Sequence, residues 1–260
     1  MKKKNVTKWA AGALLATSFL VVSISSIVSA KEEFVIRDGV PIKYDGNEEF
    51  VIRDGILIKY NGNGGNVVIP DGVTSISEEA FKETDITGVE IPDGVQVICE
   101  RAFAFCDNLE TVEFPSTLVA IEYGAFFDDE DLTQISIPEG VQTIGESVFA
   151  SCDNLQKVEL PESLLSIGYQ CFERCESLEE ISIPDSVTAL SDRAFSECVN
   201  LKKVDLPESI YLFPGQIFSH CENIEEIVIP NGPRTMGRPF MDECYKLKSI
   251  TIPPSITYFE

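Results

Sequence analysis

The segment "SIPEGVQTIGESVFASCDNLQKVELP", from Ser136 to Pro161, contains one full period of a repeat. It opens with a short strand-like run that ends in Ile-Pro and closes with another that ends in Leu-Pro. Equivalent prolines are 22 residues apart once and 23 residues apart thereafter, at Pro70, Pro92, Pro115, Pro138, Pro161, Pro184, Pro207, Pro230 and Pro253. Self-similarity at a period of this length indicates a solenoid of stacked coils.

Each period predicts one β-strand before its proline. Val158 and Leu160 alternate with Glu159, which predicts a strand with two residues facing the core and one facing solvent. The proline ends the strand, where its missing N–H costs least. A turn follows, often Asp-Gly, Glu-Gly or Glu-Ser, and then a second apolar pair such as Val141 and Ile144.

A small residue then begins a predicted short helical turn that contains a phenylalanine. The phenylalanine lies eleven positions after the proline of its repeat, at Phe81, Phe103, Phe126, Phe149, Phe172, Phe195 and Phe218. One coil cannot bury its apolar side alone, whereas stacking places Phe on Phe and Ile on Ile in a continuous core. We therefore expect residues 65–260 to form a solenoid whose strands pair in parallel with both neighbours, about 4.8 Å apart.

The repeat "L-x-x-V-x-I-P-x-x-V-x-x-I-G-x-x-A-F-x-x-C" resembles the BspA-like leucine-rich repeats of bacterial secreted and surface proteins. The resemblance covers about Asn66 to Glu260. It implies a leucine-rich-repeat solenoid that acts as a binding scaffold in adhesion or protein–protein interaction, and not as an enzyme.

The segment before the coils has two parts. Residues 1–30 have a lysine-rich start, an apolar run and the small residues of Val28-Ser29-Ala30, which predicts an export signal and a secreted or cell-surface protein. Residues 31–64 contain "EEFVIRDGVPIKYDGN" followed by "EEFVIRDGILIKYNGN". Asp-Gly between apolar alternations predicts two β-hairpins, interpreted as a cap on the first coil. The alternative is a separate ligand module.

Composition excludes several classes of protein. After residue 30 the chain has 16 basic and 43 acidic side chains, which argues against nucleic acid and anionic membranes as partners. No later apolar run is long enough to span a membrane. His220 is the single histidine, and neither a phosphate-binding loop nor an evident nucleophile with its base is present. We expect no enzyme activity, no cofactor and no metal.

Six of the eight cysteines share one register, at Cys106, Cys152, Cys175, Cys198, Cys221 and Cys244. Parallel inward side chains predict a row of buried free thiols and not disulfides. Asp129 interrupts this row within the acidic run Asp128–Asp131. A carboxylate in the core is costly, so we expect the loop to bulge outward as a solvated turn. A calcium site is the alternative.

The outward residues before each Ile-Pro or Leu-Pro form the candidate partner-binding row. Its central members are Glu90, Glu113, Ser136, Glu159, Ser182 and Asp205. Glu90 and Glu113 are expected at the carboxyl spacing of a retaining glycosidase, but a shallow sheet offers no catalytic pocket. The expected partner is an extracellular matrix or cell-surface protein, with a basic surface if charge steers binding. A glycan-binding module and a structural spacer are the alternatives. We expect a monomer, with prolines blunting the last edge; end-to-end dimerisation is the alternative.

Overall fold

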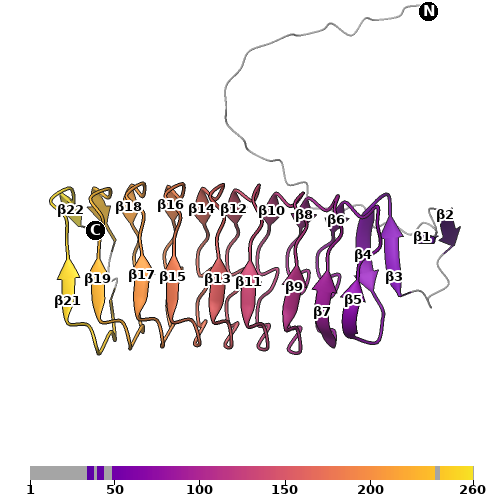
Figure 1. The fold of residues 1–260 in the computed structure, drawn as a ribbon, viewed down its shortest axis with the longest axis horizontal. Helices are drawn as coiled ribbons and strands as arrows, with labels where there is room; N and C mark the ends of the chain where they lie inside the picture. The colour runs from indigo at the N-terminus through magenta and orange to yellow at the C-terminus, as the bar shows by residue number, and fades with distance from the viewer. Residues whose placement is uncertain (1–33, 38–39, 44–48, 238–240, 260) are drawn as a thin grey trace, which may run out of the picture. The chain divides into compact units, whose positions relative to one another are not determined.

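The computed structural model describes residues 34–37, 40–43, 49–237 and 241–259. Contacts divide the chain into two units, residues 1–32 and Glu33–Glu260, and every described residue belongs to the second. The predicted export signal lies outside the described residues. The second unit is a parallel β-solenoid of stacked coils, which confirms the predicted fold (Figure 1).

One strand of each coil precedes the repeat proline, and together these strands form the main sheet. Their alternate side chains point into the core, as the period-2 pattern predicts. In the described residues they are β5 (Gly65–Val68), β7 (Ile86–Glu90), β9 (Thr111–Glu113), β11 (Gln134–Ser136), β13 (Lys157–Glu159), β15 (Glu180–Ser182), β17 (Lys203–Asp205), β19 (Glu226–Val228) and β21 (Ser249–Thr251).

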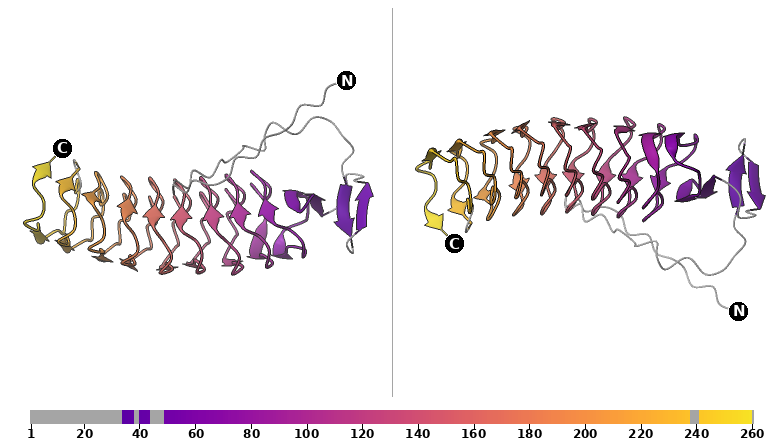
Figure 2. Two further views of the ribbon diagram at one scale, coloured as in Figure 1. Left: turned by 90° about the horizontal axis from the view of Figure 1, so that it is seen from above. Right: turned by 90° about the horizontal axis from the view of Figure 1, so that it is seen from below.

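A second, shorter strand follows the proline in each coil, and these strands form the second sheet. They stack in chain order like the main strands (Figure 2). In the described residues they are β6 (Ser75–Ile76), β8 (Val97–Ile98), β10 (Ala120–Ile121), β12 (Thr143–Ile144), β14 (Ser166–Ile167), β16 (Ala189–Leu190), β18 (Leu212–Phe213), β20 (Thr235–Met236) and β22 (Tyr258–Phe259).

Two antiparallel hairpins precede the coils in the sequence. The first joins β1 (Phe34–Arg37) to β2 (Val40–Lys43), and the second joins β3 (Phe50–Arg53) to β4 (Ile56–Tyr60). Strand β4 also pairs in parallel with β6, so the second hairpin extends the second sheet.

The core is built around a continuous stack of aromatic rings. The seven phenylalanines of the repeat are fully buried, and neighbouring centroids lie between 4.7 and 6.3 Å apart. The hairpin β3–β4 continues this stack, because Tyr60 lies 4.9 Å from Phe81 and Phe50 lies 5.4 Å from Tyr60. Each coil therefore buries its largest side chain against equivalent side chains of its neighbours.

The segment around each phenylalanine forms consecutive turns in place of the predicted helical turn. Two residues per coil, four positions apart, adopt left-handed backbone angles, as at Ser147 (φ 53°) and Ser151 (φ 61°). The N–H groups of Ser147, Phe149 and Ser151 donate to carbonyls of the next coil at 2.8–2.9 Å. In a helix these N–H groups would donate to carbonyls of the same segment. Here they donate to the next coil, so hydrogen bonds between coils take the place of a helical turn.

The main sheet is divided into small groups, although the repeat predicts pairing of every strand with both neighbours. Hydrogen-bonded pairing joins β5–β7–β9, β11–β13, β15–β17 and β19–β21. Within a pair, Ser163 Oγ donates to the carbonyl of Val141 at 2.9 Å and accepts from the N–H of Gly140 at 2.9 Å. From β11 onward the main strands pair two by two. In β11–β13 and β15–β17 a strand followed by Ile-Pro pairs with one followed by Leu-Pro, whereas both strands of β19–β21 are followed by Ile-Pro.

The second sheet is interrupted once in the described residues, between β16 and β18. In earlier coils the residue after the second strand donates its N–H to the preceding coil, as Ser191 does to the carbonyl of Ile167 at 3.1 Å. The equivalent residue after β18 is Pro214, which has no N–H to donate. The hydrogen bonds of the second sheet therefore stop between β16 and β18. They resume between β18 and β20, where the N–H of Gly237 donates to the carbonyl of Phe213.

Candidate functional site

The candidate binding row lies on the solvent-facing side of the main sheet. All six predicted residues are exposed. The register places Glu90 beside Glu113, Ser136 beside Glu159 and Ser182 beside Asp205. The pattern of short strands thus brings side chains 23 residues apart in sequence onto neighbouring positions of one surface. Their role in binding remains a prediction.

The first part of this surface is an acidic hollow over β5, β7 and β9. Its volume is about 470 Å³ and it is shallow. Its lining includes apolar side chains, among them the exposed Val68 and the half-buried Phe114. It also includes four carboxylates, from Asp71, Glu90, Asp93 and Glu113. Among the described residues no lysine or arginine forms an ion pair with these four groups.

The second part carries paired charges of both signs. Lys157 Nζ lies 2.5 Å from Glu159 Oε1, and Ser136 Oγ donates to Glu159 Oε2 at 2.9 Å. These two contacts lower the pKa of Glu159. In the same way, Lys203 Nζ lies 2.8 Å from Asp205 Oδ2, and this hydrogen bond raises the pKa of the lysine. Ionised side chains therefore alternate in sign along β13 and β17.

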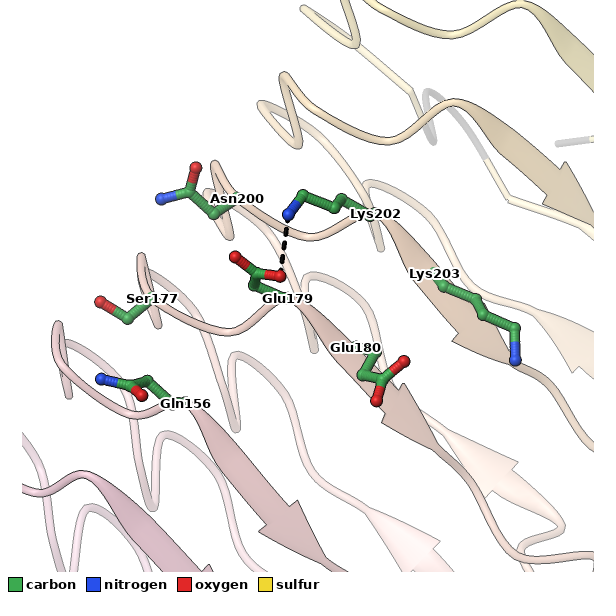
Figure 3. A pocket seen from close by; sticks show the side chains of 7 residues that line it. All are labelled: Gln156, Ser177, Glu179, Glu180, Asn200, Lys202 and Lys203. Atoms are coloured by element: carbon green, nitrogen blue, oxygen red, sulfur yellow. Dashed lines mark ion pairs between the residues drawn. The ribbon is translucent and has the colours of Figure 1, made fainter.

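A polar hollow of about 590 Å³ lies beside these strands (Figure 3). Its lining combines amide, hydroxyl, carboxylate and ammonium groups, and Lys202 Nζ lies 2.8 Å from Glu179 Oε2 across it. The remaining lining residues are Gln156, Ser177, Glu180, Asn200 and Lys203. The sequence pattern did not predict this hollow, because its lining comes from loop positions and strand starts in different coils.

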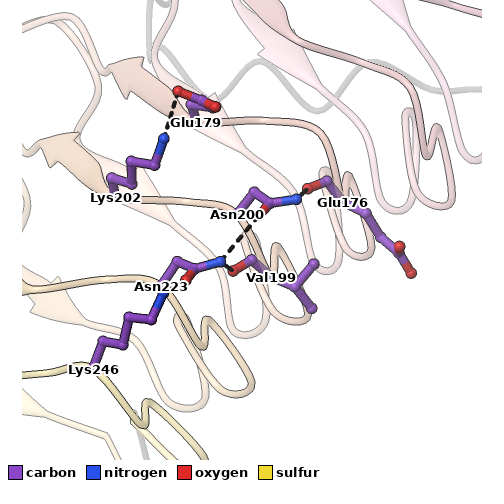
Figure 4. A network of polar contacts seen from close by, with 7 residues as sticks. All are labelled: Glu176, Glu179, Val199, Asn200, Lys202, Asn223 and Lys246. Atoms are coloured by element: carbon purple, nitrogen blue, oxygen red, sulfur yellow. Dashed lines mark hydrogen bonds and ion pairs between the residues drawn. The ribbon is translucent and has the colours of Figure 1, made fainter.

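A ladder of amide side chains holds the loops at the rim of this surface (Figure 4). Asn200 Nδ2 donates to the carbonyl of Glu176 at 2.9 Å, and Asn223 Nδ2 donates to the carbonyl of Val199 at 2.8 Å. Asn223 also donates to Asn200 Oδ1 at 3.0 Å, and Lys246 Nζ donates to Asn223 Oδ1. Each bond joins one coil to the next, so the rim loops are tied to one another.

The outward positions of the described main strands hold no aromatic side chain. The most exposed tyrosines, Tyr211, Tyr245 and Tyr258, lie outside the main strands. A sugar is usually bound by stacking on such rings. The outward face of the described main strands therefore lacks a stacking platform of this kind.

The predicted cysteine row lies inside the coils. All eight cysteines are thiols in the structure. In the row, each Sγ donates to a phenylalanine carbonyl of the preceding coil at 3.1–3.2 Å. Burial raises the pKa of Cys106 and Cys198 to about 12, so these thiols stay protonated and unreactive.

The predicted outward bulge at Asp129 is wrong. Asp129 is fully buried and keeps the position of the missing cysteine. The N–H of Leu132 donates to its carbonyl at 3.2 Å, as the N–H of Leu155 does to that of Cys152 at 3.0 Å. The bulge was expected because the side chain was taken to be ionised, but burial raises its pKa well above the usual value.

Neither a metal cluster nor a spanning helix occurs in the described part of the chain. No group of three or more His, Cys, Asp or Glu side chains there is arranged to hold a metal ion, the run Asp128–Asp131 included. The same residues form no helix with the length and apolar character needed to cross a membrane.

The chain belongs to the BspA-type leucine-rich repeat family. The model of the BspA type leucine rich repeat region matches residues 59–176 and 143–260, with six copies of the repeat. The family and the solenoid together define a repeat scaffold for protein interaction, a fold that is typically non-enzymatic. No curated protein matches the sequence.

Solved bacterial leucine-rich repeat proteins share this fold. The Treponema pallidum leucine-rich repeat protein is 34% identical, with a TM-score of 0.62, over 65% of this chain and 82% of its own. A leucine-rich repeat protein from Bacteroides ovatus is 21% identical, with a TM-score of 0.51, over 89% of this chain and 78% of its own. The second similarity concerns the fold alone.

Proposed function

We propose that this chain is an exported, non-enzymatic scaffold that binds an extracellular matrix or cell-surface protein on the solvent-facing side of its main sheet. The observation that carries the proposal is the ordered polar surface, with an acidic hollow at β5–β9 and paired charges of both signs at β13–β17. Extended faces of solenoids suit large partners. Protein interfaces combine an apolar centre with a charged rim, as this surface does around Val68 and Phe114.

The acidic hollow favours a basic segment of the partner. Lysine or arginine stems would lie on the apolar part of the lining while their charged ends meet Glu90 and Glu113. Complementary charge would raise the association rate, and added salt would lower it. Secretion or display at the cell surface is proposed from residues 1–30, and the adhesive role from the family.

We also propose that residues 31–64 cap the solenoid. Support comes from β3–β4, in which β4 pairs with β6 and Tyr60 stacks on the Phe81 ring. A hairpin in this position covers backbone groups of β6 that would otherwise attract another strand. The same hairpin buries Leu57 and Tyr60 of β4 against the coils.

A binding screen tests the proposed function. The chain from Lys31 onward is immobilised and exposed to a panel of extracellular matrix proteins and to a glycan array. Binding of a protein with a basic segment is expected. Binding of glycans alone, or binding of nothing in either panel, would refute the proposal in favour of a glycan-binding module or a spacer.

Charge reversal then locates the surface. The double variant Glu90→Lys/Glu113→Lys should weaken protein binding at least tenfold, chiefly through a slower association rate, because like charges would meet the basic segment. Glu78→Lys/Glu146→Lys is the matched control, since it changes the net charge equally at exposed positions outside the main strands. Equal effects of the two variants, with the fold intact by circular dichroism, would place the binding surface elsewhere.

A further inference from the structure

Asp129 replaces a thiol in a hydrogen-bonding pattern that runs through the solenoid. In six other coils a cysteine Sγ donates to the carbonyl oxygen of the phenylalanine 25 or 26 residues earlier. By this register the acceptor for position 129 is the carbonyl of Phe103. The pattern therefore has one position where the donor residue is an acid and not a thiol.

The backbone donor that usually accompanies this pattern is also diverted. The N–H of Cys152 donates to the carbonyl of Phe149 in its own coil, and Cys175 and Cys221 make the same contact. The N–H of Cys106 instead donates to Asp129 Oδ1 at 2.8 Å. Among the described residues, neither of these usual donors thus reaches the carbonyl of Phe103.

The second carboxyl oxygen of Asp129 is buried and has no hydrogen-bond partner. Oδ2 of Asp129 and the carbonyl oxygen of Phe103 therefore occupy positions that a hydrogen bond joins in the other coils. One proton on Oδ2 satisfies both groups, because a protonated carboxyl group has an O–H donor. Leaving an ionised carboxylate there would bury an uncompensated charge.

The surroundings of Asp129 favour the protonated form. Burial is the largest influence on its pKa, and the negative charges of Asp107 and Asp128 act in the same direction, against the single hydrogen bond from Cys106. Burial raises the pKa of Asp128 and of Asp153, and the positive charge of Arg174 only opposes this rise. Besides Arg174, the titratable groups around the loop come from three coils: Cys106 and Asp107, then Asp128, Glu130 and Asp131, then Cys152 and Asp153.

We propose that Asp129 carries a proton in the folded protein and donates it to the carbonyl oxygen of Phe103, so that the solenoid becomes less stable at this coil as the pH rises. Below the pKa of an unfolded aspartate, about 3.9, the group is protonated in both states. Above it the folded state retains a proton that the unfolded state releases. Stability is therefore lost with increasing pH until the folded group itself ionises.

Denaturant unfolding of the full chain between pH 4 and 9 tests this proposal, with Asp129→Asn and Asp129→Cys as variants. The unfolding constant of the wild type relative to either variant should rise tenfold per pH unit above about 4, until Asp129 ionises. Glu130→Gln is the matched control, because it removes the adjacent exposed carboxylate; its ratio to the wild type should stay nearly constant.

Infrared spectroscopy of the folded protein provides a readout that does not depend on unfolding. At neutral pH the wild type and Glu130→Gln should show the carbonyl band of a protonated carboxylic acid, and Asp129→Cys should lack it. If Asp129→Asn does not fold, Asp129→Cys restores the thiol row and allows the same comparison. A missing acid band in the wild type, or a pH-independent stability ratio for the Asp129 variants, would overturn the proposal.

Discussion

The aromatic stack makes Phe195→Ala the most informative perturbation of stability. The Phe195 ring is fully buried, with the Phe172 ring at 5.6 Å and the Phe218 ring at 6.3 Å. Truncation removes buried apolar surface and leaves a cavity between two coils that backbone hydrogen bonds hold in place. Such substitutions cost about 3–5 kcal/mol. This is a large part of the stability of about 5–15 kcal/mol that is typical of folded domains.

Guanidinium unfolding followed by circular dichroism measures this loss. Cys198→Ala is the matched control in the same coil, because it removes a small buried group and one hydrogen bond, to the carbonyl of Phe172 at 3.1 Å. It should cost only about 1 kcal/mol. Leu165→Ala, at an exposed position, should cost less still. A Phe195→Ala variant no less stable than Cys198→Ala would refute the view that stacked rings are the main source of cohesion between coils.

Two further outcomes are expected. Alkylation of the native protein should label the half-buried Cys99 and Cys244 first and the six buried thiols only after denaturation, with all eight thiols then free by mass spectrometry; native cysteine–cysteine peptides would contradict the prediction of free thiols. Tyr60→Ala should lower the free energy of unfolding by about 3–5 kcal/mol if the hairpin β3–β4 unfolds together with the coils. A separate early transition of the hairpin, with the main transition unchanged, would identify an independent module.

The repeat in the sequence was sufficient to predict the stacked coils, because a period of 23 residues must return each phenylalanine to the same place. Phe149 and Val158 could thus be assigned to the core from their spacing alone. Burial of Asp129 could not, because the ionised state of the side chain was assumed and protonation depends on neighbours in other coils. The interruption at Pro214 did have a visible signal, a proline where the other coils have a residue with an N–H group.

The candidate surface was predictable only in part. Alternation along each strand placed Glu90 and Glu113 on the outward side, as their exposure confirms. It could not predict that Glu159 would be held by Lys157 and Ser136, because those contacts depend on side-chain orientation. The polar hollow beside β15 and β17 was also missed, since its walls come from loops whose spacing in the sequence carries no periodic signal.

The grouping of main strands into pairs limits how such a protein can change in length. Beyond β9, the hydrogen bonds of the main sheet close within two-coil units, and Pro115 to Pro161 spans one such unit of 46 residues. Duplication or deletion of a single coil would leave one strand without its partner. It would also place a serine such as Ser163, which bonds to Gly140 and Val141 of its paired coil, opposite the wrong turn. Recombination between repeats in the coding sequence should therefore be tolerated best in steps of two coils, and the length of the solenoid should evolve in the same increments.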